Sequence, residues 1–218
     1  MSVSAVGSMG VSACLRVLHG PVYRRRIGAL ARLLASEVRT GDRVLDVGCG
    51  SGALGAAILA DPARPAGVHY EGAEVAPRPG TPFPVTKFDQ GRRLPFADKS
   101  FDVVVAADVL HHVPDEPALL KDIARVARRR VFLKDHCLHG VLAQARLSFI
   151  DWAANYGHGV PCLYRYHDLQ GWHDLFAATG LAMAKEHLGL NLYPPGLNLL
   201  FGRRLQYLAL LEPSPFDE

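Results

Sequence analysis

Short apolar runs alternate with segments of helical periodicity along most of this 218-residue chain. One such run is RVLDVG at 43–48, and the segment after it, SGALGAAILAD at 51–61, has the small residues of a helix that ends before Pro62. The alternation continues as far as RVFLKD at 130–135. Strand, helix and strand in this order predict an α/β fold, in which helices cover both faces of a mostly parallel sheet.

The other elements are expected from the same patterns. A helix is expected over 22–38, because Ile27, Leu30 and Leu34 share one face, and another over 114–127, which starts with acidic residues. Further strands are expected at 68–75, 84–88, 101–110, 181–190 and 199–211. No internal repeat or low-complexity linker divides the chain, so we expect one domain over 21–218 after a flexible N-terminus at 1–20.

Charge and cysteine content limit the compartment and the partners. The formal net charge is +3, and the arginine clusters are spread between elements, so we interpret most arginines as solvated and a nucleic-acid surface as the weaker alternative. The cysteines lack metal-type or redox-type spacing, which favours free thiols in a reducing cytoplasm; they are Cys14, Cys49, Cys137 and Cys162. No apolar run is long enough to span a membrane, and no signal peptide is recognisable.

A glycine-rich loop follows the first strand, and ligands of parallel α/β sheets bind beyond the carboxyl ends of the strands. The loop runs from Asp46 to Gly52 with glycines at alternate positions, which lets the backbone turn tightly beside a ligand. The next helix offers free amide donors at its N-terminus. Glu74 ends the following strand, where an acidic side chain can take both hydroxyls of a ribose. The alternative for Glu74 is an ordinary surface carboxylate.

Three ordered motifs resemble the class I S-adenosylmethionine-dependent methyltransferase family, in its small-molecule, ubiquinone/menaquinone methyltransferase-like branch. They are VLDVGCGSG at 44–52, Glu74, and LPFADKSFDVVVAADVLHHVPDEPALLKDIARVA at 94–127. The segments KDH at 134–136 and DWAAN at 151–155 resemble a bacterial subgroup of that branch. The resemblance implies a Rossmann-like sheet of seven strands, mostly parallel, with the C-terminal strand antiparallel.

The resemblance also implies S-adenosyl-L-methionine as cofactor and assigns its contacts. The loop residues Asp46, Gly48, Cys49 and Gly50 are expected at the methionine end of the cofactor. Glu74 is expected at the ribose, Asp89 with Gln90 at the adenine edge, and the backbone of Ala107 and Asp108 at the methionine amino group. A sulfonium cofactor carries no phosphate, which fits carboxylates at positions where a dinucleotide site needs amide donors.

One segment departs from the family pattern. Members of the family usually have a helix after the ribose-binding residue, but here VAPRPGTPFPVTKF at 75–88 contains four prolines. Proline inside a helix removes a hydrogen bond and clashes with the preceding turn. We therefore expect a proline-rich loop on the adenine side.

Five titratable residues follow the fourth and fifth strands and are the candidates for contact with the methyl acceptor. They are Asp108, His111, His112, Asp135 and His136. In-line methyl transfer depends mainly on positioning, and it needs a general base only where the acceptor must lose a proton. The alternatives are packed histidines at a helix start, and Asp135 as the cap of a helix that begins near Leu138.

The segment at about 138–178 is expected to form a lid that contacts the substrate. It is rich in aromatic residues with polar neighbours, which suits a pocket for a partly apolar small molecule: Phe149, Trp152, Tyr156, Tyr164, Tyr166 and Trp172. Packing of Trp152 and Trp172 against the sheet is the alternative.

Other acceptors and chemistries are disfavoured but stay open. The motifs of base-methylating enzymes are missing after the fourth strand, which argues against nucleic acid as the partner; an RNA or protein acceptor, or a non-catalytic scaffold, are the alternatives to a small molecule. Asp108 and Asp135 occupy places where catechol-type enzymes hold Mg²⁺, yet the motifs resemble the metal-free branch more closely, so we expect no metal. The sequence leaves the oligomeric state and the methylated atom open.

Overall fold

The computed structural model describes residues 20–155 and 160–214. Nearly all of the N-terminus expected to be flexible, together with Tyr156 of the expected lid, lies outside these residues. The strands are β1 (Arg43–Val47), β2 (His69–Glu74), β3 (Val85–Lys87), β4 (Phe101–Ala107), β5 (Ala127–His136), β6 (Leu181–Leu188) and β7 (Gln206–Pro213). A helix described over 20–35 precedes them, followed in chain order by α2 (Ala53–Leu59), α3 (Glu116–Val126), α4 (Ala143–Asn155), α5 (Leu169–Ala178) and α6 (Pro195–Phe201).

The seven strands form one sheet in the order β3-β2-β1-β4-β5-β7-β6. Neighbouring strands pair in parallel except at β7, which runs antiparallel to both β5 and β6. The predicted fold class, a mostly parallel sheet with an antiparallel C-terminal strand, is therefore confirmed. The strand order reverses between β1 and β4, and ligands of open α/β sheets bind at such a point.

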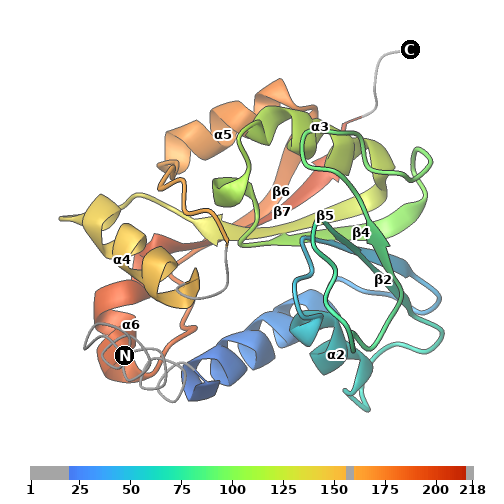
Figure 1. The fold of residues 1–218 in the computed structure, drawn as a ribbon, viewed down its shortest axis with the longest axis horizontal. Helices are drawn as coiled ribbons and strands as arrows, with labels where there is room; N and C mark the ends of the chain where they lie inside the picture. The colour runs from blue at the N-terminus through green and yellow to red at the C-terminus, as the bar shows by residue number, and fades with distance from the viewer. Residues whose placement is uncertain (1–19, 156–159, 215–218) are drawn as a thin grey trace, which may run out of the picture.

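Helices cover both faces of the sheet, with α3 and α5 on one side and the 20–35 helix with α2 on the other (Figure 1). Successive strand residues point to opposite faces, so β4 contributes to two separate cores. Val103 and Val105 pack with Leu34 of the first helix, and Val104 packs with Trp172 of α5. All five of these side chains are buried.

The proline-rich segment between β2 and β3 contains no helix, as predicted. Its Phe83 is buried and packs against Tyr70 of β2, with ring centroids 4.8 Å apart. A Cβ atom built on Gly52 would lie 3.0 Å from the Phe83 ring. The segment is thus held against the glycine-rich loop by one aromatic side chain.

Several strand boundaries differ from the prediction, and two of the differences have a local cause. The strand expected over 101–110 ends at Ala107, because Asp108 has a φ of 58° and Leu110–His112 forms a 3-10 turn. The strand expected over 199–211 begins only at Gln206, so its first part was wrong. Pro195 starts α6 there, in agreement with the preference of proline for the first position of a helix.

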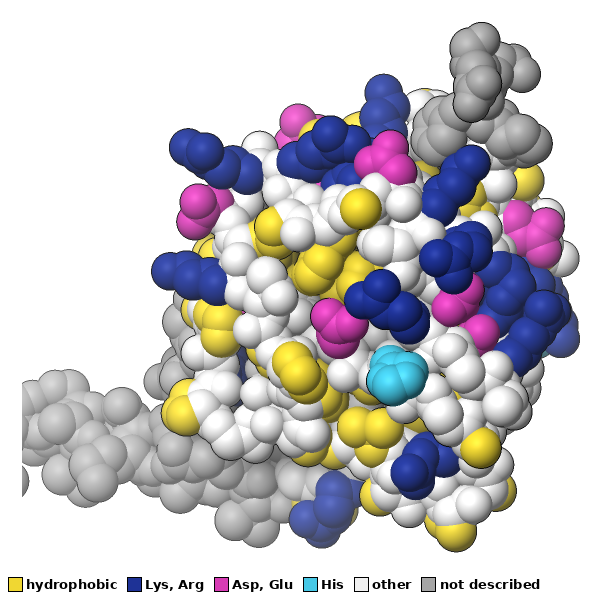
Figure 2. All heavy atoms as spheres, turned by 90° about the vertical axis from the view of Figure 1, so that its right-hand side faces the viewer, with side chains coloured by type: hydrophobic (Ala, Val, Ile, Leu, Met, Phe, Trp, Pro, Cys, Tyr) yellow, Lys and Arg dark blue, Asp and Glu magenta, His cyan; other side chains and the backbone are white. Residues whose placement is uncertain are grey.

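The arginines of β5 are paired with acidic residues rather than freely solvated. Arg128 contacts Asp102 at 2.5 Å, and Arg129 contacts Asp42 at 2.5 Å. On the face shown in Figure 2, Lys and Arg side chains are scattered and interspersed with acidic ones, with no continuous basic tract.

From the sequence we expected free thiols and no membrane-spanning segment. In the described part of the chain the thiols of Cys49, Cys137 and Cys162 are free, as expected, and Cys14 lies outside it. Among the described helices, none has both the length and the apolar character needed to cross a membrane.

Candidate active site

A cavity of about 1450 Å³ lies at the carboxyl ends of β1, β2, β4 and β5. Its wall includes the glycine-rich loop, the ends of β2 and β4, the 3-10 turn and part of α4. All of the predicted cofactor and acceptor residues line it except Asp89 and Asp135. The topology therefore gathers residues that are up to 170 positions apart in sequence, from Tyr23 to Tyr193, around one space.

The glycine-rich loop needs glycine for two reasons. Gly48 and Gly50 have φ values of 69° and 56°, which side-chain-bearing residues rarely adopt. A Cβ atom on Gly48 would also lie 2.6 Å from Cγ2 of Val109, whereas one on Gly50 would meet nothing within 4 Å. Gly48 therefore allows close packing of the β1 loop on the β4 loop, and Gly50 leaves the loop backbone open to the cavity.

Asp46 is buried below this loop and is only 3% exposed. Its Oδ2 accepts a hydrogen bond from the Tyr70 hydroxyl at 3.0 Å. Burial raises the pKa of Asp46 to about 7; the Tyr70 hydrogen bond lowers it and the nearby Glu74 charge raises it. The carboxyl therefore takes up a proton far more readily than an exposed aspartate does.

Glu74 joins the end of β2 to the glycine-rich loop. Its Oε2 accepts from the Gly50 amide at 2.8 Å, and its Oε1 accepts from the Val75 amide at 2.8 Å. Each carboxylate oxygen can accept more than one hydrogen bond, so lone pairs remain for hydroxyl donors in the cavity. Glu74 is therefore held by backbone contacts at the cavity wall, which distinguishes it from an ordinary surface carboxylate.

The two residues expected at the adenine edge lie differently. Gln90 lines the cavity, and its Nε2 donates to the His112 carbonyl at 3.4 Å. Asp89 is exposed, and its carboxylate lies 3.9 Å from Arg92. The structure brings Gln90, and not the Asp89 side chain, to the cavity wall.

Asp108 follows β4 and is held between two cations. Its carboxylate pairs with the Arg26 guanidinium and, at 2.5 Å, with Nζ of Lys134. Lys134 is fully buried, and burial followed by the Arg26 charge lowers its pKa well below the usual value. Sequence reasoning missed Arg26, because the predicted helix gave no sign that this arginine turns toward the sheet edge.

Asp135 is not a helix cap, because α4 begins only at Ala143, so that alternative was wrong. Its Oδ1 lies 2.5 Å from Nδ1 of His111 and also accepts from the His136 amide at 2.7 Å. Burial raises the pKa of Asp135, but the charge and hydrogen bond of His111 lower it, and the net shift is downward. A carboxylate that stays ionised beside His111 orients the imidazole.

Burial lowers the pKa of two further histidines, His112 and His136. Burial and the His111 charge lower the pKa of His112, and burial and the Lys134 charge lower that of His136 well below its usual value. His112 Nδ1 lies 2.9 Å from the Pro161 carbonyl. His136 is 5% exposed, and its carbonyl accepts from the Trp172 indole at 2.8 Å, so Trp172 packs in the core.

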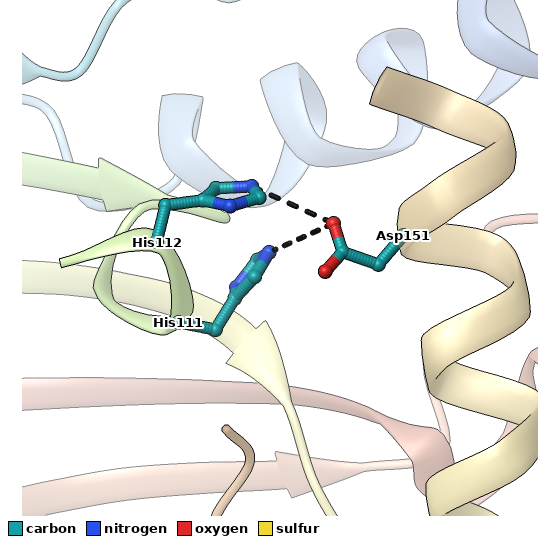
Figure 3. Close-up of side chains that lie close together, drawn as sticks. All are labelled: His111, His112 and Asp151. Atoms are coloured by element: carbon teal, nitrogen blue, oxygen red, sulfur yellow. Dashed lines mark ion pairs between the residues drawn. The ribbon is translucent and has the colours of Figure 1, made fainter. Parts of the chain in front are cut away.

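Asp151 of α4 is a buried site residue that sequence reasoning placed in the lid without giving it a role. Its Oδ2 accepts from the Tyr166 hydroxyl at 3.0 Å, and its Oδ1 accepts from Asn155 at 2.8 Å. The side chains of His111 and His112 point toward Asp151 (Figure 3). The DWAAN segment held the signal, since Asp151 and Asn155 are four residues apart on one helix.

The sheet and the glycine-rich loop define a Rossmann-like fold with a cavity at the β1–β4 switch point, where proteins of this fold bind their ligands. Residues 22–186 match the model of the methyltransferase domain family, so the chain belongs to that family. Membership implies S-adenosyl-L-methionine as the cofactor.

Similar proteins agree with this family. The 27-O-demethylrifamycin SV methyltransferase of Amycolatopsis mediterranei is 34% identical over 104 residues, 42% of this chain and 36% of that protein. The ubiquinone biosynthesis O-methyltransferase of Aeromonas salmonicida is 30% identical over 106 residues, 43% of this chain and 42% of that protein. The matches thus span about two fifths of the length of these relatives.

The fold also has close solved counterparts. A complex of the Trm112 methyltransferase activator and a methyltransferase from Haloferax volcanii contains a chain that superposes with a TM-score of 0.64 at 18% identity. The superposition covers 95% of this chain and 96% of that one. This likeness concerns the fold.

Proposed function

We propose that this chain is an S-adenosylmethionine-dependent methyltransferase that acts on a small, partly apolar molecule by in-line transfer. The observation that carries the proposal is the single cavity that joins the glycine-rich loop and Glu74 to the buried histidines. A cofactor and an acceptor must share one space for the methyl group to pass between them.

In the proposed complex, the loop at Asp46, Gly48, Cys49 and Gly50 holds the methionine end of the cofactor. Glu74 takes the ribose hydroxyls, and Gln90 holds the adenine edge, whereas the Asp89 side chain lies outside the cavity wall. The backbone of Ala107 and Asp108 faces the methionine amino group. The carboxylates of this set suit a cofactor that carries an ammonium and a ribose but no phosphate.

Methyl transfer breaks the bond between the methyl carbon and sulfur while the acceptor atom bonds to that carbon, and S-adenosylhomocysteine leaves. Because the sulfonium already activates the methyl group, the protein supplies positioning and exclusion of water. An acceptor hydroxyl must also lose its proton, and His111, His112 and His136 are the cavity residues nearest to that role. Asp108 is engaged by Arg26 and Lys134, and Asp135 acts through His111.

Two further observations favour a small, partly apolar acceptor. The cavity wall on the lid side combines Ile150, Val160 and Pro161 with a few polar groups. The two relatives carry names that refer to rifamycin SV and to ubiquinone biosynthesis, both of which concern small molecules.

Calorimetry with S-adenosylhomocysteine tests the cofactor half of the proposal. The unaltered chain should bind one equivalent, and Glu74→Ala should weaken binding at least about tenfold, since charge-assisted hydrogen bonds are worth about 1.5–3 kcal/mol each. Glu71→Ala is the matched control, because Glu71 lies on the same strand but pairs with Arg43. Absence of binding by the unaltered chain would overturn the proposal.

A substrate screen tests the acceptor half. Phenols, enols and hydroxylated polyketide fragments are incubated with the cofactor, and methylated products are detected by mass. A mass gain of one methyl group on such molecules is expected. Methylation confined to RNA or protein substrates would replace the small-molecule assignment.

A further inference from the structure

We propose that His111, His112 and Asp151 form a binding site for one divalent cation of the zinc type, on the acceptor side of the cavity. The inference goes beyond methyl transfer and stands independently of it. It also departs from the sequence expectation of no metal, which considered only Asp108 and Asp135. Two imidazole nitrogens and one carboxylate oxygen are a common donor set for Zn²⁺ and similar cations.

The three ligand atoms converge on one point, as Figure 3 shows. Asp151 Oδ1 lies 3.8 Å from Nε2 of His111 and 3.7 Å from Nε2 of His112. The three atoms all lie within 4.8 Å of one another. Two ligands about 2.0 Å from a tetrahedral ion are about 3.3 Å apart, so each histidine–carboxylate distance must shorten by about half an ångström to bind an ion. The observed distances are too long for hydrogen bonds.

Each of the two histidines is held through its Nδ1 atom, on the side of the ring away from Asp151. A carbonyl oxygen only accepts, so His112 Nδ1 donates to Pro161 at 2.9 Å. His111 Nδ1 lies 2.5 Å from Asp135 Oδ1. These contacts direct the Nε2 atom of each ring toward Asp151 Oδ1.

Neighbouring groups fix the three ligands in this arrangement. Asp135 orients His111 in the way that carboxylates orient histidines bound to metals. Tyr166 and Asn155 each donate to one oxygen of Asp151, which fixes the carboxylate. Such outer partners raise the basicity and the order of metal ligands.

The site is enclosed but remains in contact with the cavity. His111 and Asp151 are 4% and 2% exposed, whereas the His112 side chain keeps 17% of its surface. All three residues line the cavity. Three protein ligands leave at least one coordination position for an oxygen ligand from the cavity, which is the arrangement of reactive rather than purely structural zinc sites.

A second histidine and carboxylate cluster in the described residues fits a cation less well. It consists of His111, Asp135 and His136. There the direct contact of 2.5 Å between His111 and Asp135 leaves no room for an ion between their atoms. The same contact serves the first cluster, because it turns Nε2 of His111 toward Asp151.

Metal titration of the full chain tests the inference. The protein is treated with a chelator, desalted and titrated with Co²⁺, and the visible d–d absorption is recorded; Zn²⁺ is followed by calorimetry. One equivalent of each metal should bind. His112→Ala and Asp151→Asn should each weaken binding at least about tenfold, the lower limit for loss of even an outer partner. His173→Ala, which removes a histidine paired with Glu186 outside the cavity, should bind as the unaltered chain does.

Two outcomes would overturn the inference: no stoichiometric uptake, or uptake that survives both ligand substitutions. If Asp151→Asn does not fold, as judged by circular dichroism, His112→Ala decides alone, since His112 is the least buried ligand. Uptake of Co²⁺ without S-adenosylhomocysteine binding would support the metal site and overturn the proposed function. Binding of S-adenosylhomocysteine without uptake of Co²⁺ would support the proposed function and overturn the metal site.

Discussion

Tyr70 of β2 donates its hydroxyl to Asp46 of the adjacent strand β1 at 3.0 Å, and both side chains are buried. The bond crosses the sheet directly below the glycine-rich loop. Burial raises the pKa of Asp46 to about 7, although the Tyr70 bond opposes the rise. The pKa of a carboxyl at the cavity wall is therefore tuned by a residue that faces the core on the neighbouring strand.

Asp46 makes stability depend on pH. Its pKa rises from an ordinary 3.8 to about 7 on folding, so the folded state keeps a proton that the unfolded state releases between these values. The stabilisation is complete below pH 3.8 and is lost as the pH rises to 7. Between pH 5 and pH 8, Asp46→Asn should gain about 2–3 kcal/mol in free energy of unfolding relative to the unaltered chain, at ~1.4 kcal/mol per pH unit.

Urea unfolding across that pH range checks this, with Tyr70→Phe as the companion variant. Loss of the hydroxyl removes an interaction that lowers the Asp46 pKa, so the pH dependence of Tyr70→Phe should extend to higher pH. Parallel stability curves for Asp46→Asn and the unaltered chain would contradict the prediction.

Gly48→Ala should destabilise the protein by about 2–4 kcal/mol, from about 1 kcal/mol for the positive φ and 1–3 kcal/mol for the contact with Val109. Gly41→Ala is the matched control, since Gly41 has a φ of 79° but nothing within 4 Å of its Cβ position. Thermal unfolding should separate the two variants by the contact alone. Equal losses would mean that Val109 moves aside at no cost.

Asp108→Asn should destabilise the protein by about 3–5 kcal/mol, because it leaves the buried Lys134 without its partner. The double variant Asp108→Asn/Lys134→Met should recover a large part of the loss, since no unpaired lysine charge is then buried. Urea unfolding of the two single variants and the double variant gives the coupling energy. Additive losses would indicate that Lys134 is already neutral in the fold.

Asp135→Asn should lower turnover about 10- to 100-fold and leave the affinity for S-adenosylhomocysteine within about twofold, because Asp135 positions His111 and lies outside the cavity wall. Turnover is measured on an acceptor found in the screen, and affinity by calorimetry. Asp102→Asn, at the opposite end of the strands, serves as control. An equal loss of affinity and turnover would point to general damage to the site.

The site residues at the strand ends could be identified from the sequence, because parallel strands bring their carboxyl ends to one edge of the sheet. Asp46 and Glu74 could be selected for this reason before any contact was known, and both line the cavity. The number of strands and the antiparallel C-terminal strand followed from a resemblance to a family rather than from periodicity. Boundaries were misplaced where the backbone is strained, as at Asp108 with its positive φ, and where an apolar run is helical, as in α6.

Contacts between distant segments could not be predicted in the same way. Arg26 reaches Asp108 across 82 positions of sequence, and Asp151 meets His111 only because α4 packs beside the 3-10 turn. Such contacts depend on the angles at which helices and strands pack, and the residue types in the sequence do not determine those angles. The sequence contains only the local part of this arrangement, because Asp151 and Asn155 are four residues apart on one helix.

The place of β7 has a consequence for the synthesis of the chain. This strand is last in sequence among the described strands, yet it lies between β5 and β6 and buries Tyr207, Ala209 and Leu211 completely. Until residue 213 has left the ribosome, β5 presents an unpaired apolar edge and β6 has no neighbour in the sheet. Exposed strand edges promote aggregation, and late long-range pairing slows folding. A chain that ends before Gln206 should therefore be prone to aggregation, whereas one that includes β7 and has left the ribosome should not.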